Sequence, residues 1–192
     1  MIVFLLQHNF YFSWLLRHGA VKEKLSMDEN GFVPMNEIIS KLNTKRKSKV
    51  VTVDDVTDIV STCPKQRFKI EIIGGTTKIR ANQGHTMKQT MSIELEAVRT
   101  FSERVFHGTS RSAWQIIEEK GLNRMKRNHI HMALESGLEK HRIKSELFIE
   151  IDANKAIQEG IKFFKSENGV ILSPGDENGV LPPKYFKGIH NF

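Results

Sequence analysis

Cysteine is nearly absent from this sequence, and so are long apolar runs. Cys63 is the only cysteine among the 192 residues, so neither an intramolecular disulfide nor a zinc site built on several cysteines can form. Such cysteine usage is typical of a reducing compartment, and we expect a cytoplasmic or nuclear protein. The apolar run at residues 1–6 is interrupted by Gln7, His8 and Asn9 and is too short to span a membrane. We therefore expect neither a membrane segment nor a signal peptide.

The common short signatures of nucleotide-binding enzymes and hydrolases are also missing. The sequence contains no Gly-x-Gly-x-x-Gly, no Walker loop, no Gly-x-Ser-x-Gly and no His-Glu-x-x-His. His129 and His131 alternate along a segment that we expect to be a strand, where alternate side chains point to opposite faces. The two imidazoles would therefore not bind one metal ion, and we predict no metal site.

Positive charge is what the sequence has in excess. It carries 29 Lys and Arg against 22 Asp and Glu, a formal net charge of +7 and a pI of about 9.5. A basic surface attracts polyanions, of which nucleic acid is the commonest. The most concentrated run, Lys-Arg-Lys-Ser-Lys at 45–49, is either a solvated loop or an edge that faces a polyanion.

The first half of the sequence predicts two short helices. Apolar residues spaced along 35–42 give one apolar face to a helix that begins near Pro34. Thr52 and Asp55 have the spacing of a capping box, with Asp in place of the usual Glu or Gln. The apolar residues that follow predict a second helix, which Pro64 closes.

A hairpin follows these helices. Apolar and polar residues alternate over 68–72, Gly74-Gly75 makes a turn, and the chain returns over 76–80. Helices followed by a two-stranded hairpin suggest a winged-helix-like lobe over residues 1–88, a plan often used to bind nucleic acids.

The second half changes character and predicts short strands with few helices. Residues 91–104 read as a mixed linking segment, and 105–106 as a buried strand that delivers His107-Gly108-Thr109 at its end. A helix begins at Ser110 and ends at Gly121. The elements expected after it are strands at 130–132, 147–151, 163–164 and 170–172 and a helix at 134–141. We predict an α+β fold, in which this second lobe, residues 89–192, surrounds a split sheet.

The tripeptide His107-Gly108-Thr109 is suited to contact a nucleotide. A glycine lets the backbone approach a ligand closely, and His and Thr side chains can hydrogen-bond ribose hydroxyls. The basic, histidine-bearing segment 127–131 lies a short distance along the chain and could contact a phosphate.

These motifs and others, in their order and spacing, resemble the RNA 2′-phosphotransferase family, also called the tRNA 2′-phosphotransferases. The resemblance begins with His107-Gly108-Thr109, Gly121-Leu122 and Arg127-x-His129-Ile130-His131. It extends over nearly the whole chain, through Leu15-Leu16-Arg17-His18-Gly19-Ala20, Asp28-x-x-Gly31-Phe32-Val33, Lys65-Gln66-Arg67-Phe68, Arg80-Ala81-Asn82-Gln83-Gly84-His85, Asn168-Gly169-Val170-Ile171-Leu172 and Leu181-Pro182-Pro183-Lys184-Tyr185-Phe186.

The resemblance implies an NAD-dependent enzyme that removes the 2′-phosphate left at a tRNA splice junction. A 2′-phosphate oxygen attacks the nicotinamide ribose and nicotinamide departs, which leaves an ADP-ribosylated RNA phosphate. The ribose 2″-hydroxyl then attacks the phosphorus, and ADP-ribose 1″,2″-cyclic phosphate is released. The implied partner is 2′-phosphorylated RNA, and we expect a monomer with NAD as co-substrate and no metal.

The family's essential group of three arginines and one histidine matches Arg17, His18, Arg67 and Arg127. Guanidinium groups offer fork-shaped donors to phosphate oxygens and stay charged, which suits phosphoryl chemistry. The first lobe would supply three of these residues and the second lobe Arg127, with the phosphate held between the lobes. Arg124 is a competitor for the role of Arg127. Gln83 and His85 are further expected RNA contacts.

The second lobe resembles ADP-ribosyltransferases, and that resemblance assigns NAD binding to His107, Gly108, Thr109 and His131. The ADP-ribosyltransferases carry a His-Tyr-Glu triad, and its counterparts here would be His107, His131 and, in place of Glu, an apolar residue on the strand at 170–172. His129 is expected to be structural. The sequence departs from the family at Met132-Ala133, where Ser or Thr is common, and at its start, which lacks the usual polar lead-in.

Two other functions are compatible with the sequence. An enzyme of the same fold could ADP-ribosylate a terminal phosphate of RNA or DNA and stop at that adduct. A non-enzymatic protein could bind nucleic acid through the first lobe alone. The nucleotide product distinguishes the three.

Overall fold

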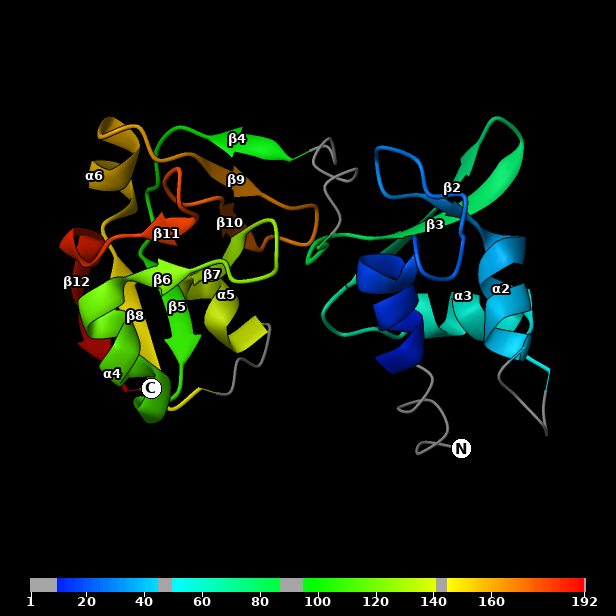
Figure 1. The fold of residues 1–192 in the computed structure, drawn as a ribbon, viewed down its shortest axis with the longest axis horizontal. Coiled ribbons are helices and arrows are strands. Elements are labelled where there is room, and N and C mark those ends of the chain that lie inside the picture. The colour runs from blue at the N-terminus through cyan, green and yellow to red at the C-terminus, as the bar shows by residue number, and fades with distance from the viewer. Residues whose placement is uncertain (1–9, 45–49, 87–94, 141–144, 192) are drawn as a thin grey trace. The chain divides into compact units, whose positions relative to one another are not determined.

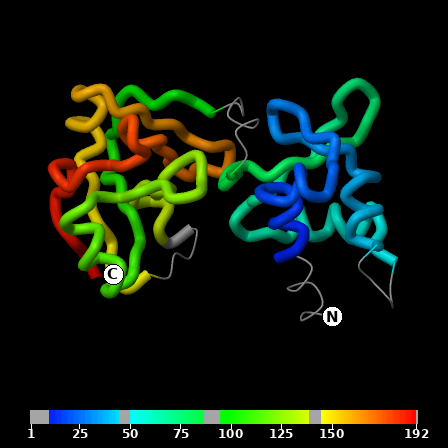
Figure 2. The backbone as a smooth tube through the Cα atoms, in the orientation of Figure 1, coloured from blue at the N-terminus to red at the C-terminus, as the bar shows by residue number. Residues whose placement is uncertain are grey.

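The chain folds into two compact units, Met1–Glu94 and Leu95–Phe192, shown as a ribbon in Figure 1 and as a backbone tube in Figure 2. The computed structural model describes residues 10–44, 50–86, 95–140 and 145–191. The predicted boundary between residues 88 and 89, the basic run at 45–49 and most of the atypical start lie outside the described residues. The predicted α+β class is confirmed, because both units contain helices and sheet.

Unit 1, Met1–Glu94, is a small antiparallel sheet with helices. Residues 10–14 are helical and continue directly into a π-helical turn, η1. The remaining elements are β1 (Val33–Pro34), α2 (Met35–Thr44), α3 (Val53–Ser61), β2 (Phe68–Ile73) and β3 (Thr76–Ala81), and η1 itself spans Leu15–Gly19. The strands pair in the order β1-β3-β2. Apolar residues of all three helical segments and of the sheet form one core.

The helices and the hairpin predicted for this unit are confirmed. Thr52 Oγ1 accepts the N–H of Asp55 and the Asp55 carboxylate accepts the N–H of Thr52, so the capping box of α3 is complete. Strands β2 and β3 pair from Phe68↔Ala81 to Ile73↔Thr76, with the Gly74-Gly75 turn between them. The likeness of this unit to a winged helix stays a prediction.

Unit 2, Leu95–Phe192, is built on a seven-stranded sheet in the order β12-β8-β5-β7-β10-β9-β4, beside a two-stranded β11-β6 pair. The strands are β4 (Glu96–Val98), β5 (Val105–Thr109), β6 (Leu122–Asn123), β7 (Ile130–Leu134), β8 (Leu147–Ile151), β9 (Phe163–Lys165), β10 (Ile171–Ser173), β11 (Val180–Leu181) and β12 (Phe186–His190). The helices are α4 (Arg111–Lys120), α5 (Glu135–Lys140), α6 (Ala153–Gln158) and a short 3-10 turn, η3 (Pro183–Tyr185).

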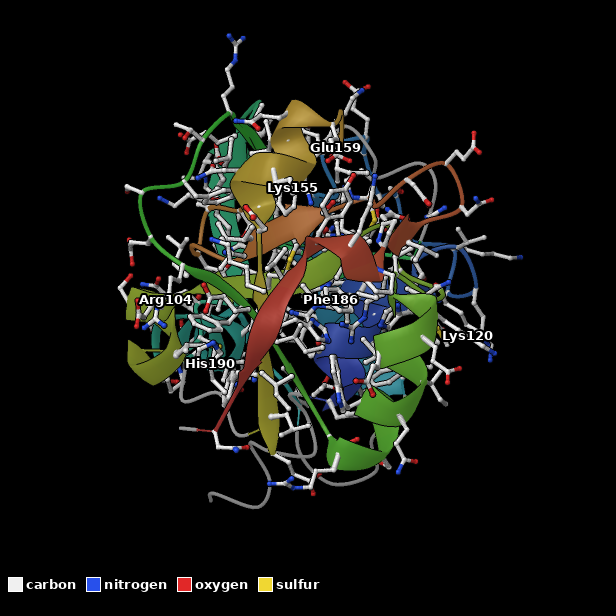
Figure 3. All side chains as sticks on the ribbon, turned by 90° about the vertical axis from the view of Figure 1, so that its left-hand side faces the viewer. Arg104, Lys120, Lys155, Glu159, Phe186 and His190 are labelled. Carbon is white, nitrogen blue, oxygen red and sulfur yellow. The ribbon has the colours of Figure 1, made fainter. Side chains whose placement is uncertain are left out.

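Helix α4 has the predicted ends and packs near β12. Ser110 Oγ accepts the N–H of Ala113, and Gly121 ends the helix with a φ of 82°. The ring of Trp114 in α4 lies 6.1 Å from that of Phe186 in β12, measured between centroids. Strand β12 crosses the unit from Phe186 to His190 (Figure 3).

Strand β5 differs from its prediction in length. It includes His107-Gly108-Thr109 instead of delivering them at its end, because it pairs with β8 from Val105↔Ile151 to Thr109↔Leu147. Its pairing with β7, by contrast, covers only Val105 and Phe106. The sheet is therefore split beside residues 107–109, on the side of β7.

Three other expectations change at their edges. The linking segment predicted for 91–104 contains strand β4, which pairs with β9. The strand predicted for 170–172 is Ile171–Ser173, and the helix predicted to begin at 134 begins at Glu135. Within the described ranges, no helix combines the length and the apolar character that crossing a membrane requires.

Candidate active site

Arg17 and His18 lie in the π-helical turn η1, where Leu15 and Leu16 anchor the chain. Both leucines are fully buried in the core of unit 1, whereas the Arg17 side chain is half-buried and that of His18 is exposed. Because the two leucines anchor the turn in the core, Arg17 and His18 are held at the surface of unit 1.

The segment that follows β3, residues 82–86, contacts this turn at two places. The Thr86 N–H donates to the Arg17 carbonyl over 3.1 Å, and Thr86 Oγ1 lies 3.2 Å from Nδ1 of His18. Gly84 has a φ of +90°, and a Cβ there would lie 3.4 Å from Nε of Arg17. The arginine side chain therefore passes directly over the glycine, with its guanidinium carbon 5.9 Å from the centre of the Phe68 ring.

The same segment also holds the turn that carries Arg67. Asn82, only 5% exposed, donates from Nδ2 to the Gln66 carbonyl over 2.8 Å and from its backbone N–H to the Arg67 carbonyl over 2.9 Å. Gln66 has a φ of 43°, a left-handed conformation that is costly for a residue other than glycine. Asn82 therefore stabilises a strained turn, and Arg67 is the residue that this turn presents.

Arg67 has one further contact, to the only cysteine. Its Nη1 lies 3.6 Å from Sγ of the buried Cys63, four residues earlier. Among the described residues it forms no ion pair with a carboxylate, so its charge is not neutralised locally. Cys63 thus has a structural place beside a predicted site residue.

Residues 82–86 therefore bring Arg17, His18 and Arg67 together in unit 1, although the three are up to 50 positions apart in the sequence. Two arginines and a histidine held by one short segment favour an anion, and phosphate oxygens suit the fork of an arginine. Neither Asn82 nor Thr86 is predicted from the sequence to belong to the site. Asn82 lies inside the motif at residues 80–85, and nothing local marks Thr86.

The two further expected RNA contacts differ in exposure. Gln83 is half-buried, whereas His85 is only 3% exposed. Arg80, which begins the same motif, is 4% exposed. It donates to the Asn30 carbonyl over 3.3 Å, and its guanidinium carbon lies 4.6 Å from the centre of the Phe32 ring. His85 and Arg80 therefore offer little surface to a ligand.

In unit 2, the imidazole of His107 spans the split between β5 and β7. Its Nδ1 lies 2.8 Å from the carbonyl oxygen of His131. A carbonyl only accepts, so Nδ1 carries the hydrogen. Burial lowers the pKa of His107, while the bond to the carbonyl opposes that shift. The ring is therefore neutral at pH 7, with Nε2 as its acceptor, which is the form that bonds a ribose hydroxyl.

His131 lies on β7 opposite Leu172 of β10, its register partner. Cross-strand partners share a face of the sheet, so an apolar side chain is the neighbour of His131 there. His129 packs its ring against Phe164 at 5.9 Å, and burial, followed by the charge of Arg124, lowers its pKa. In the described part of the chain, no cluster of three His, Cys, Asp or Glu side chains is arranged to bind a metal ion.

Arg124 and Arg127, the two candidates for the phosphate contact of unit 2, have different surroundings in the loop before β7. Arg124 donates from Nη1 to the Arg127 carbonyl over 3.3 Å, and its N–H bonds the Gly179 carbonyl at 2.9 Å. Gly179 has a φ of +76°, and a Cβ there would lie 2.3 Å from Nε of Arg124. The Arg124 side chain is thus part of the loop's own structure, while the Arg127 side chain is exposed.

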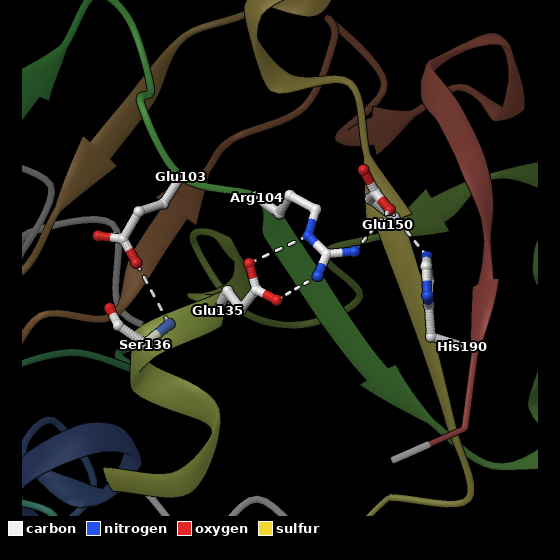
Figure 4. Close-up of polar contacts among 6 residues, drawn as sticks. All are labelled: Glu103, Arg104, Glu135, Ser136, Glu150 and His190. Atoms are coloured by element: carbon white, nitrogen blue, oxygen red, sulfur yellow. Dashed lines mark hydrogen bonds and ion pairs between the residues drawn. The ribbon is translucent and has the colours of Figure 1, made fainter.

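An ion-pair cluster lies elsewhere on unit 2 (Figure 4). Arg104 donates from Nε to Glu135 over 3.0 Å and contacts Glu150, whose carboxylate lies 2.7 Å from Nε2 of His190. Glu135 raises the pKa of Arg104, and Arg104 in turn lowers that of Glu135. These side chains tie β8, β12 and the start of α5 together. We regard the cluster as structural, since its charges satisfy one another.

Comparisons with known proteins agree with the motifs. Residues 10–175 match the model of the RNA 2′-phosphotransferase, Tpt1/KptA family. A protein named tRNA 2′-phosphotransferase 1 from Danio rerio is 39% identical over 188 residues, which cover 91% of this chain and 80% of that protein. One of the same name from Homo sapiens is 39% identical, with 91% and 71% covered. A tRNA 2′-phosphotransferase from Saccharomyces cerevisiae is 35% identical over 177 residues, with 84% and 75% covered.

Proposed function

The chain belongs to the RNA 2′-phosphotransferase family, and we propose that it removes the 2′-phosphate that tRNA splicing leaves on RNA, with NAD⁺ as co-substrate. The observation that carries this proposal is the convergence of Arg17, His18 and Arg67 on residues 82–86 of unit 1. These are three of the four residues that the resemblance assigns to the phosphate.

The three side chains suit a phosphate that acts as a nucleophile. Arg17 and Arg67 each offer several N–H donors to its oxygens and stay charged at any relevant pH. Positioning and charge stabilisation supply most of the catalysis in phosphoryl chemistry, so such donors act on the transition state more than on proton transfer. His18 can add one more donor. Arg127, exposed on the loop of unit 2, is the fourth proposed contact.

The NAD side is proposed for the split beside β5. The neutral His107 presents Nε2 as an acceptor, Gly108 leaves room for close approach of a ligand, and Thr109 and His131 supply further polar groups. When bound, NAD⁺ would supply the electrophilic ribose carbon and release nicotinamide, and the later products are ADP-ribose 1″,2″-cyclic phosphate and RNA with a free 2′-hydroxyl. With Leu172 beside His131, the strand lacks the carboxylate that would activate a neutral acceptor. A phosphate already carries negative charge and does not need that activation.

The test is a product analysis. The protein is incubated with NAD⁺ and an RNA oligonucleotide that bears one internal 2′-phosphate, and nicotinamide, RNA and nucleotide products are identified by mass. We expect equal amounts of nicotinamide, dephosphorylated RNA and the cyclic phosphate. The same RNA without the 2′-phosphate is the control and should release no nicotinamide.

Two outcomes would contradict the proposal. A stable ADP-ribose adduct on an RNA or DNA end would identify the alternative enzyme, an ADP-ribosyltransferase of terminal phosphates. Binding of RNA without nicotinamide release would identify a binding protein.

A further inference from the structure

Residues 82–86 contact each of the three proposed phosphate-binding residues of unit 1 in a different way. Asn82 acts on Arg67 through the backbone, and Gly84 contacts Arg17 by having no side chain. Thr86 contacts a site residue through its side chain, since its hydroxyl lies 3.2 Å from Nδ1 of His18. This contact can be removed without changing a backbone hydrogen bond.

Thr86 is itself fixed to the turn that it serves. Its N–H donates to the Arg17 carbonyl over 3.1 Å, so its backbone is tied to the residue just before His18. The imidazole, by contrast, is exposed and extends from a helical turn on two rotatable bonds. A hydrogen bond to one ring nitrogen restricts that rotation and determines which nitrogen the ring presents to a ligand.

We infer that Thr86 is a positioning residue for His18, which it orients so that His18 acts on the RNA 2′-phosphate through Nε2; this inference rests on the proposed function. The hydroxyl can donate to Nδ1 of the neutral tautomer that carries its hydrogen on Nε2, and it can accept from Nδ1–H of the charged ring. In both cases Nε2 carries the hydrogen, and a phosphate oxygen accepts it. Thr86 therefore serves the ring in either protonation state.

The chemistry of the residue fits its place. A carboxylate is a common partner for Nδ1 of a functional histidine, but here it would add a negative charge beside a site for an anion. A hydroxyl orients the ring without that repulsion. Threonine thus supplies direction alone, which is what a histidine facing a phosphate requires.

Three variants test the inference. Thr86→Val replaces the hydroxyl by a methyl group of the same shape, and Thr86→Ser keeps the hydroxyl. Thr57→Val removes a hydroxyl from helix α3, where Oγ1 donates to the Val53 carbonyl. The single-turnover rate of 2′-phosphate loss is measured with saturating NAD⁺, and the ¹⁵N chemical shift of His18 Nδ1 is measured without substrate.

We expect Thr86→Val to slow the reaction about 10- to 100-fold, because this is the effect of losing one hydrogen bond to a charged group. Its Nδ1 shift should move, because that nitrogen loses its partner. Thr86→Ser should restore the rate to within about 3-fold of the wild type and restore the shift. Thr57→Val should change neither quantity, which separates the effect from the loss of any threonine hydroxyl in this unit.

The outcomes separate the positioning role of Thr86 from the proposed function. If the wild type is active, any of three results overturns the positioning role alone. These are an undiminished rate in Thr86→Val, an Nδ1 shift that does not move in that variant, and a Thr86→Ser variant as slow as Thr86→Val. A wild type that leaves 2′-phosphorylated RNA intact overturns the proposed function and this role with it, even where the Nδ1 shift responds to Thr86.

Discussion

The two units organise their proposed sites in opposite ways. In unit 1, residues that are distant in the sequence are held by a short irregular segment, 82–86, through a few hydrogen bonds and one close packing contact. In unit 2, His107 and His131 come from neighbouring strands, and the register of the sheet places them. The charges differ as well, since residues 1–94 contain 14 Lys and Arg against 9 Asp and Glu, and residues 95–192 contain 15 against 13. Unit 1 can therefore lose its proposed site without losing its fold, whereas the proposed site of unit 2 is inseparable from its sheet.

The largest effect is expected for Arg127, which belongs to unit 2 but is exposed on a loop and is not positioned by the sheet. Arg127→Ala should slow 2′-phosphate transfer about 10²- to 10³-fold, the range for removing one donor to developing charge. Its thermal midpoint should stay close to that of the wild type, because the side chain is exposed. Single-turnover kinetics and calorimetry measure the two quantities. Lys126→Ala, at the exposed neighbour, is the matched control; a full rate in Arg127→Ala would remove Arg127 from the site.

The next effect concerns the segment in unit 1. Asn82→Ala removes the donor to the Gln66 carbonyl from a side chain that is only 5% exposed, and it should lower the free energy of unfolding by about 1–3 kcal/mol. Transfer of the 2′-phosphate should fall with it, because Arg67 follows the strained Gln66. Urea unfolding and turnover at a temperature where the variant is folded measure both. If the folded variant retains full activity, Asn82 supports the fold but not the position of Arg67.

In unit 2, a variant that adds a side-chain atom tests how the loop before β7 is held. Gly179→Ala introduces a Cβ 2.3 Å from Nε of Arg124 at a φ of +76°, so both the arginine and the backbone must move. We expect a loss of about 1–3 kcal/mol in the free energy of unfolding. Gly188→Ala, where a Cβ would meet nothing within 4 Å, is the matched control and should change little. Equal melting temperatures for the two variants would show that Arg124 is not fixed over Gly179.

The smallest effect is a dependence of stability on pH that resides in unit 2. Burial lowers the pKa of His107, so the folded protein binds a proton there less readily than the unfolded chain does. The neutral ring therefore contributes its full stability above the ordinary histidine pKa, and this contribution is lost as the pH falls toward the lowered pKa. Urea midpoints at pH 7.5 and pH 5.5 should show a smaller decrease in His107→Asn than in the wild type. An identical decrease would assign the effect to other groups, such as His129, whose pKa is also lowered.

The elements that could be predicted from the sequence are those whose signals are local. The capping box of α3 and the alternation of β2 lie within a few residues, and both were predicted with nearly correct bounds. Strand β5 was predicted too short because its last three residues pair with β8, some 40 positions away. Strand β12 was missed because Lys187, Gly188 and Ile189 are all exposed and give no alternating pattern.

For the candidate site, too, residues marked by local motifs could be predicted and residues that act through distant contacts could not. The resemblance supplied the identities of Arg17, His18 and Arg67, but not the residues that hold them. The contact of Thr86 with His18 joins residues 68 positions apart, and that of Asn82 with Gln66 joins residues 16 apart. Such contacts depend on how β3 ends relative to η1 and β2, which no spacing in the sequence expresses.

The split beside residues 107–109 also has a thermodynamic consequence. Strand β5 pairs over its whole length with β8 but over only two residues with β7, so the sheet is held less fully on that side. A ligand bound only by the folded form adds RT ln(1 + [L]/Kd) to stability, about 2.7 kcal/mol at a hundred times its dissociation constant. NAD⁺ bound at the proposed site would thus act as a missing neighbour of β5, and the free energy of unfolding would rise with the concentration of the dinucleotide.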